Sequence, residues 1–199
     1  MTIYLAVLFL HVLSAIALFI AFVLEGAIFI RIRSAWSIEQ ARFFTRAFRR
    51  LWVIYAPSFL GILAGGLYLA SPYGLGSVWI PAALLATLMI VVVGGVVTWR
   101  KTARLQKMLA SEAVPLEVIL AEAKSDSLLF SHGLRIGLAL GILFLMTAKP
   151  QLIPSLVALS AGVIVGLLAA AKIRRISEQA GNRCNTWSRA PQPTAPERS

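Results

Sequence analysis

The sequence predicts an all-α membrane protein, a polytopic bundle of about five transmembrane helices with its amino terminus outside. Of its 199 residues, 59% are hydrophobic and only 14% are charged, whereas soluble domains carry roughly 25% charged residues. The apolar residues gather in runs that reach the length of about 20 residues that a helix needs to cross the hydrocarbon core. The lysines and arginines lie almost entirely between or after these runs.

Four segments are long and apolar enough to span a bilayer, and a fifth is interrupted by charge. The four are residues 3–30, 51–70, 78–99 and 152–171. The fifth, residues 128–148, contains His132 and Arg135 near its start. Hydropathy alone does not decide whether this fifth segment spans.

The distribution of charge favours five spans, because loops rich in lysine and arginine stay in the cytoplasm. If residues 128–148 did not span, the basic carboxyl-terminal segment would lie outside. Five spans with the amino terminus outside place every lysine and arginine except Lys149 on the inner side. We therefore expect a multi-pass protein whose carboxyl terminus is cytoplasmic. This orientation explains the formal charge of +11, so we expect the lipid bilayer, and no nucleic acid, as the partner.

The polar segments outside the spans suggest further elements. Residues 37–50 place Ala41, Phe44 and Phe48 on one helical face and arginines on the other. This pattern predicts a helix that lies in the inner interface with its arginines near anionic lipid. Pro115 suits the first turn of a helix between the third and fourth spans.

The last part of the chain differs in composition from the rest. Residues 177–199 are rich in proline and polar residues and contain the only cysteine, Cys184. This composition predicts a disordered basic cytoplasmic tail. The transmembrane bundle is then confined to residues 1–176.

Aromatic residues support the span boundaries. Trp52 and Trp99 fall at the predicted inner boundaries, and Tyr73 and Trp79 at the outer ones. Amphipathic rings favour the headgroup region of a bilayer.

Small residues recur at four-residue spacing in the last two spans, and they predict a tight antiparallel hairpin. Backbones approach closely in lipid where such residues face one another. We interpret the pattern as packing within the chain, and a homo-oligomer or a membrane partner protein stays open as an alternative. The residues concerned are Gly133, Gly137 and Gly141, and Ala158, Gly162, Gly166 and Ala170.

Ionisable residues inside the predicted spans are the first candidates for function, since such groups are costly in a bilayer. Glu25 lies near the inner boundary at about the depth of His132 and Arg135, which share a helical face. We predict an ion pair between Glu25 and Arg135 with His132 beside it. Its use is either structural or in the passage of protons or small solutes.

A second candidate site involves His11. Met89 lies near the depth of His11, and a histidine and a methionine together suit copper(I). A single histidine could also hold haem. His11 and His132 differ in depth by about 10 Å, on a rise of 1.5 Å per residue, so they are not expected to share one metal or haem.

The sequence contains no nucleotide-binding loop, zinc-protease motif or catalytic triad that we recognise. We therefore expect a non-enzymatic structural, assembly or transport-related component. The alternatives are a haem-, porphyrin- or copper-handling protein that uses His11, and a proton or small-solute pathway through Glu25, His132 and Arg135.

Two stretches resemble known proteins: "LHVLSAIALFIAFVLEG" at residues 10–26 and "LRIGLALGILFLMTAKP" at residues 134–150. They resemble uncharacterised bacterial inner-membrane proteins that are similar, at the first helix, to copper-resistance-D-type proteins and to the small membrane protoporphyrinogen oxidases. The resemblance implies a bacterial inner-membrane location. It also implies that His11 matches the histidine with which such families hold copper or haem.

Overall fold

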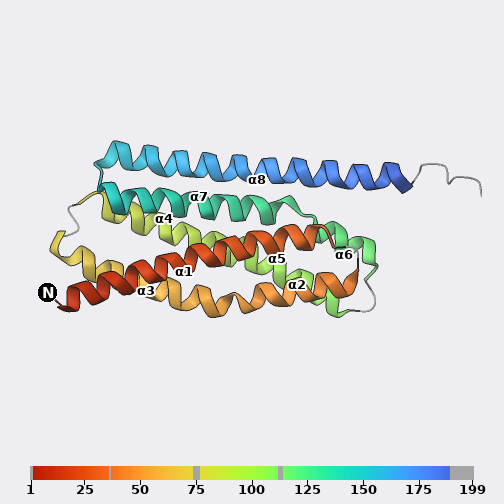
Figure 1. Cartoon of the computed structure of the whole chain (residues 1–199), viewed down its shortest axis with the longest axis horizontal. Helices are drawn as coiled ribbons and strands as arrows, with labels where there is room; N and C mark the ends of the chain where they lie inside the picture. The colour runs from red at the N-terminus through yellow and green to blue at the C-terminus, as the bar shows by residue number, and fades with distance from the viewer. Residues whose placement is uncertain (1, 36, 74–76, 112–113, 189–199) are drawn as a thin grey trace, which may run out of the picture.

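The computed structural model describes residues 2–35, 37–73, 77–111 and 114–188, and it is all-α (Figure 1). In chain order the α-helices are α1 (Thr2–Arg33), α2 (Ile38–Arg50), α3 (Trp52–Ala70), α4 (Trp79–Val93), α5 (Arg100–Ala110), α6 (Leu116–Ala123), α7 (Asp126–Ala148) and α8 (Leu152–Ser188). A 3₁₀ turn, η1 (Ser71–Tyr73), follows α3, and a π-helical segment, η2 (Gly94–Trp99), joins α4 to α5.

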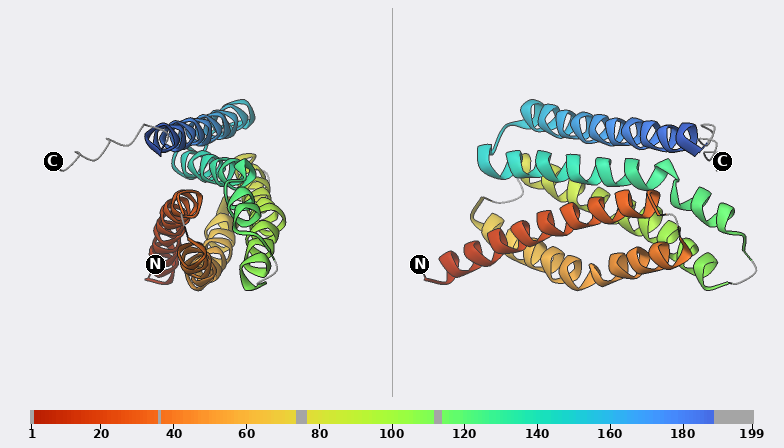
Figure 2. Two further views of the ribbon diagram at one scale, coloured as in Figure 1. Left: turned by 90° about the vertical axis from the view of Figure 1, so that its right-hand side faces the viewer. Right: turned by 45° about the vertical axis from the view of Figure 1, so that its right-hand side comes forward.

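Five helical segments are long and apolar enough to cross a membrane, which confirms the prediction of an all-α bundle with five candidate spans. They are Thr2–Arg33, Ile38–Tyr73, Trp79–Ala110, Glu117–Ala148 and Leu152–Ile176. The fourth includes the segment that hydropathy alone left undecided. The segments run alongside one another, and the start of α1 and the end of α8 lie at opposite ends of the bundle (Figures 1 and 2). We call the end formed by α2, α5, α6 and the last turns of α1 and α8 the basic end.

Helices α7 and α8 form the predicted tight hairpin, and α8 lies at the edge of the bundle (Figure 2). A Cβ atom on Gly137 would lie 2.9 Å from the carbonyl carbon of Gly162 and 3.1 Å from the Cα of Val163. The glycines therefore permit a backbone contact that no other residue allows. Lys149 ends α7 in the left-handed conformation, with φ of 47°, and its backbone N–H donates to the carbonyl of Leu145.

Helix α2 differs from the prediction of a helix in the plane of the interface. It continues through Leu51 into α3, and the two helices belong to one candidate span, Ile38–Tyr73 (Figure 1). The amphipathic pattern is present, since Ala41 and Phe48 are buried, but α2 packs against α1 and α5. An apolar helix face is satisfied by a neighbouring helix as well as by lipid, and the sequence pattern does not distinguish the two.

The carboxyl-terminal segment also differs from its prediction. Helix α8 continues to Ser188, so residues 177–188 are helical where a disordered tail was expected. Extending an existing helix adds one hydrogen bond for each residue that is fixed, whereas a new helix has an unfavourable nucleus. Residues 189–199 of the predicted tail lie outside the described residues. Pro115 directly precedes α6 and accepts hydrogen bonds from its first turn.

Aromatic rings meet at two levels of the bundle. The ring centroids of Trp52 and Trp99 are 6.1 Å apart, and those of Tyr73 and Trp79 are 5.8 Å apart. The Lys149 Nζ donates to the Tyr73 hydroxyl at 2.7 Å. The residues predicted to share a boundary are therefore neighbours in each case.

We expect Gly137→Ala to lower the free energy of unfolding by about 1–3 kcal/mol, the usual cost of overpacking. Its new methyl group overlaps the backbone of α8. The matched control is Gly95→Ala, because a Cβ atom on Gly95 meets nothing within 4 Å. Unfolding of both variants in mild detergent, followed by circular dichroism, makes the comparison. Equal stability of the two variants would contradict the tight hairpin.

Candidate functional site

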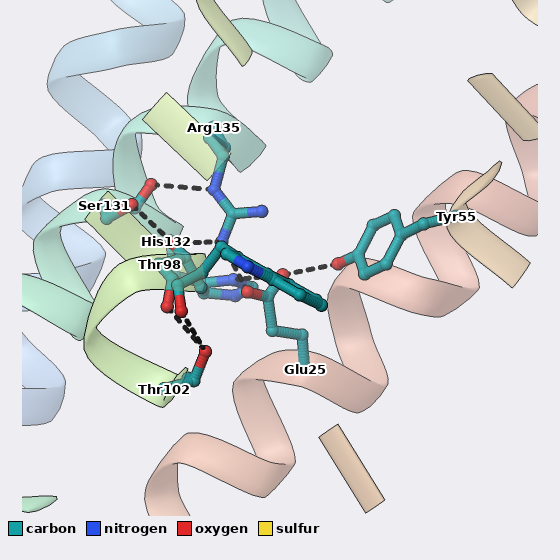
Figure 3. A network of polar contacts seen from close by, with 8 residues as sticks. Glu25, Tyr55, Thr98, Thr102, Ser131, His132 and Arg135 are labelled. Atoms are coloured by element: carbon teal, nitrogen blue, oxygen red, sulfur yellow. Dashed lines mark hydrogen bonds and ion pairs between the residues drawn. The ribbon is translucent and has the colours of Figure 1, made fainter. Parts of the chain in front are cut away.

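A cluster of polar side chains lies between helices of the bundle (Figure 3). Its Glu25 is eight residues before Arg33, the last residue of α1 at the basic end. Glu25 comes from α1, Tyr55 from α3, Thr98 from η2, and His132 and Arg135 from α7. Four of the five candidate spans therefore contribute to one site. Glu25 is 0% exposed and Arg135 is 5% exposed, so both charged side chains are enclosed by other parts of the protein.

The Glu25 carboxylate is the centre of this cluster. Its Oε1 accepts a hydrogen bond of 2.5 Å from Nη2 of Arg135, and its Oε2 accepts one from the Tyr55 hydroxyl. His132 Nδ1 lies 3.5 Å from Oε2. The ion pair that the sequence predicted is present. A buried charge is tolerated when it is paired and hydrogen-bonded in this way.

Arg135 has further partners that hold its guanidinium in place. Nη2 donates to the Thr98 hydroxyl at 3.2 Å, and Nε donates to the backbone carbonyl of Ser131 at 3.4 Å. The guanidinium carbon lies 5.6 Å from the centre of the Phe22 ring, within the range of a cation–π contact. These contacts explain how an arginine is accommodated inside an apolar span.

The π-helical segment η2 positions Thr98. Its first residue, Gly94, faces Arg135, and a Cβ atom there would be 3.5 Å from the arginine Cδ and Nη1. The Thr98 Oγ1 lies 2.8 Å from the Ser131 hydroxyl as well. Thr102 donates to the Thr98 carbonyl at 2.7 Å. Short π-helical turns inside α-helices are frequent at functional sites.

His132 is packed tightly but is not hydrogen-bonded through Nδ1. Among the described residues, this buried nitrogen has no hydrogen-bond partner. The ring lies edge-on to Phe22 and Phe29, with centroid distances of 6.2 and 6.0 Å. A Cβ atom on Gly26 would lie 2.8 Å from Nε2. The absence of a side chain at Gly26 therefore leaves the space that the imidazole occupies.

His11 lies apart from this cluster. It is fourteen residues before Glu25 in the same helix, which is roughly 21 Å at 1.5 Å per residue. Its ring packs on two glycines of α3, and Cβ atoms on Gly65 and Gly66 would lie 3.4 Å from its Nδ1 and 3.2 Å from its Cε1. Its Nδ1 donates to the Ile62 carbonyl at 3.1 Å. This hydrogen bond fixes the ring and leaves Nε2 as an acceptor, as in histidines that bind metals.

Met89, the other predicted copper ligand, lies on α4 with 46% of its surface exposed. His11 is instead turned toward α3. Within the part of the chain that the structure describes, no group of three or more His, Cys, Asp or Glu side chains is arranged to hold a metal ion. A haem or copper site at His11 stays a prediction.

Sequence reasoning missed the hydroxyl groups around the ion pair. Thr98 and Thr102 are spaced by four residues, and Ser131 precedes Arg135 by four. This spacing places each pair on one helical face. A search for polar residues at the depth of Glu25 would also have found Tyr55, four residues into the second predicted span.

No protein family, no curated protein and no solved structure matches this chain. The fold and the cluster define it as a multi-span membrane protein with a buried ion pair shared among its spans.

We expect Tyr55→Phe to lower the free energy of unfolding by about 1–2 kcal/mol, because it removes a hydrogen bond to a buried carboxylate. Tyr68→Phe is the matched control, since Tyr68 lies on the same helix and is 47% exposed. Thermal unfolding of both variants in mild detergent measures the difference. If the two substitutions are equally harmless, the Tyr55 hydroxyl does not support the cluster.

Proposed function

We propose that this chain is a multi-span protein of the bacterial inner membrane, with its amino terminus outside. We propose further that it acts as a non-enzymatic structural, assembly or transport-related component. In this proposal the pair of Glu25 and Arg135 is an internal lock that fixes the spans relative to one another. The observation that carries it is the enclosure of this pair by side chains from four spans.

The charge distribution supports the proposed orientation. The basic helices α2 and α5 lie at the basic end, whereas the connection between α7 and α8 lies at the opposite end (Figure 1). Lys149 ends α7 at this connection and donates to Tyr73. Basic segments are retained on the cytoplasmic side of bacterial membranes. We therefore propose that the basic end faces the cytoplasm.

A lock of this kind has a physical reason in a bilayer. Lipid tails are as apolar as leucine, so there is little hydrophobic force between spans, and packing and interhelical hydrogen bonds determine their arrangement. Glu25 and Arg135 satisfy each other only when α1 and α7 have one rotation and one register. Other arrangements would leave a charge without its partner.

A double-mutant cycle tests the lock. Glu25→Gln alone and Arg135→Gln alone each leave one buried charge uncompensated, and we expect each to lower the free energy of unfolding by about 3–5 kcal/mol. The double variant removes both charges, so its loss should be clearly smaller than the sum of the two single losses. Unfolding in mild detergent is the measurement.

The matched control is the cycle of Asp126→Asn and Arg174→Gln at the basic end. That pair is 3.4 Å apart with side chains that are 41% and 38% exposed, and exposed pairs contribute less than about 1 kcal/mol. Strictly additive losses at Glu25 and Arg135 would refute the lock.

A second function, the passage of protons, is favoured by one specific observation. The buried His132 Nδ1 has no hydrogen-bond partner among the described residues and faces the Glu25 carboxylate at 3.5 Å. Histidine is the side chain that gains or loses a proton near neutral pH, so His132 could carry a proton beside this carboxylate. Thr98 and Thr102 continue from the cluster toward a small pocket at the basic end, which is lined by Phe48, Arg49, Trp99, Thr102, Ala103 and Gln106.

For that second function, we expect Glu25→Gln to abolish a proton flux into vesicles that contain the protein. The substitution keeps the size of the side chain and removes the group that binds the proton. A pH-sensitive dye inside the vesicles measures the flux, and Asp126→Asn is the control for loss of a carboxylate elsewhere. A flux that is unchanged by Glu25→Gln, or absent from the unaltered protein, would exclude this function.

A further inference from the structure

A group of exposed cations lies on one side of the basic end, on helices α2 and α5. These helices pack against each other in antiparallel register. Arg42 donates to the Leu109 carbonyl at 2.8 Å, and Gln106 donates to the Thr45 carbonyl at 3.2 Å. The exposed cations that flank this contact form what we call the basic flank. Its members are Arg46, Arg49, Arg50, Arg100, Arg104 and Lys107.

The basic flank has no internal counter-charge. Helix α5 contains no acidic residue, and Glu39 is the only acidic residue of α2. Over the described ranges, no acidic side chain lies within ion-pair distance of any member of the flank. Elsewhere at the basic end the arrangement is different, because Asp126 pairs with Arg33 at 3.2 Å and with Arg174 at 3.4 Å. The flank therefore presents its charge outward.

The tryptophan pair indicates where the basic flank lies along the membrane normal. Trp52 and Trp99 meet where α2 joins α3 and where η2 joins α5, at the level where such rings favour the headgroups. Arg49 and Arg100 lie within one turn of this pair. Lys107, the farthest member, is eight residues from Trp99, or roughly 12 Å along the helix. The headgroup region and a Debye length of about 8 Å together cover this distance.

An exposed aromatic side chain lies among these cations. Phe43 of α2 is 66% exposed and lies three residues before Arg46, about one helical turn away. Helices that lie against a lipid surface combine basic and aromatic side chains in this way. A soluble acidic partner would be bound by the charges alone and would not explain the exposed phenylalanine side chain.

From these observations we propose that the basic flank is a binding site for the phosphate headgroups of anionic phospholipids in the adjoining leaflet. The spans hold α2 and α5 beside this leaflet permanently, so the lipid phosphates are the nearest polyanion to the flank. Arg49 is the central residue. It lines the small pocket between α2 and α5 together with Trp99 and Gln106, where a phosphate oxygen can accept from the guanidinium.

The test uses the full chain in phosphatidylcholine vesicles with increasing fractions of phosphatidylglycerol that carries brominated acyl chains. Quenching of tryptophan fluorescence gives the binding constant of this lipid relative to brominated phosphatidylcholine. We expect the unaltered protein to prefer phosphatidylglycerol. The double variant Arg49→Gln/Arg104→Gln should reduce the preference by about fivefold or more, because a basic residue near the surface contributes ~1 kcal/mol.

Two variants serve as controls. Lys172→Gln/Arg175→Gln removes the same charge from exposed positions of α8, outside the flank, and should reduce the preference clearly less than the flank variant, while Arg49→Lys/Arg104→Lys should retain most of it. If the two double glutamine variants reduce the preference equally, or if neither reduces it, the proposed lipid site is overturned. If the flank variant does not fold, the salt dependence decides. High salt must then abolish the preference of the unaltered chain, and a salt-insensitive preference rejects the proposal.

Discussion

The arrangement of this bundle depends on the need to pair one buried carboxylate. Glu25 has no exposed surface, and an isolated charge in such a place would cost far more than a hydrogen bond returns. Arg135 meets that need directly at 2.5 Å. This pair joins α1 to α7, and in the proposed lock it fixes their relative depth and rotation. Tyr55 and Thr98 then bring α3 and the third span to the same level.

Small residues provide the second constraint, and they act where the charges do not. The glycines of α7 and α8 bring those two helices into backbone contact, although in the described residues α8 contributes nothing to the Glu25 cluster. In a second pair of helices, Ser14 and His11 of α1 pack closely against Gly61 and Gly65 of α3. Close packing thus joins helices in pairs, and the polar cluster joins the pairs to one another. Both kinds of contact are effective in lipid, where apolar burial gives little preference for one partner over another.

Depth along a span could be predicted from the sequence, whereas rotation and fine geometry could not. Counting residues from the span ends placed Glu25 beside Arg135, because a helix rises by a constant amount for each residue. The same counting suggested Met89 as a partner of His11, and that pairing stays a prediction, because His11 donates to the Ile62 carbonyl and Met89 is partly exposed. The position of Thr98 depends on a π-helical turn, and a pattern of 3.6 residues per turn does not contain it. For α2, the sequence predicted the apolar face but not the helices that cover it.

A structural lock and a proton pathway make opposite demands on the same residues. A lock is strongest when the charges are fully enclosed, whereas a pathway needs polar groups or water that reach them. Here Leu18 and Phe22 are buried beside the cluster in the direction of the far end, while Thr98 and Thr102 extend it toward the basic end. Buried apolar side chains therefore lie on one side of the cluster, and hydroxyl groups lie on the other. The static arrangement therefore favours the lock, and transport would require a second arrangement of α1 against α7.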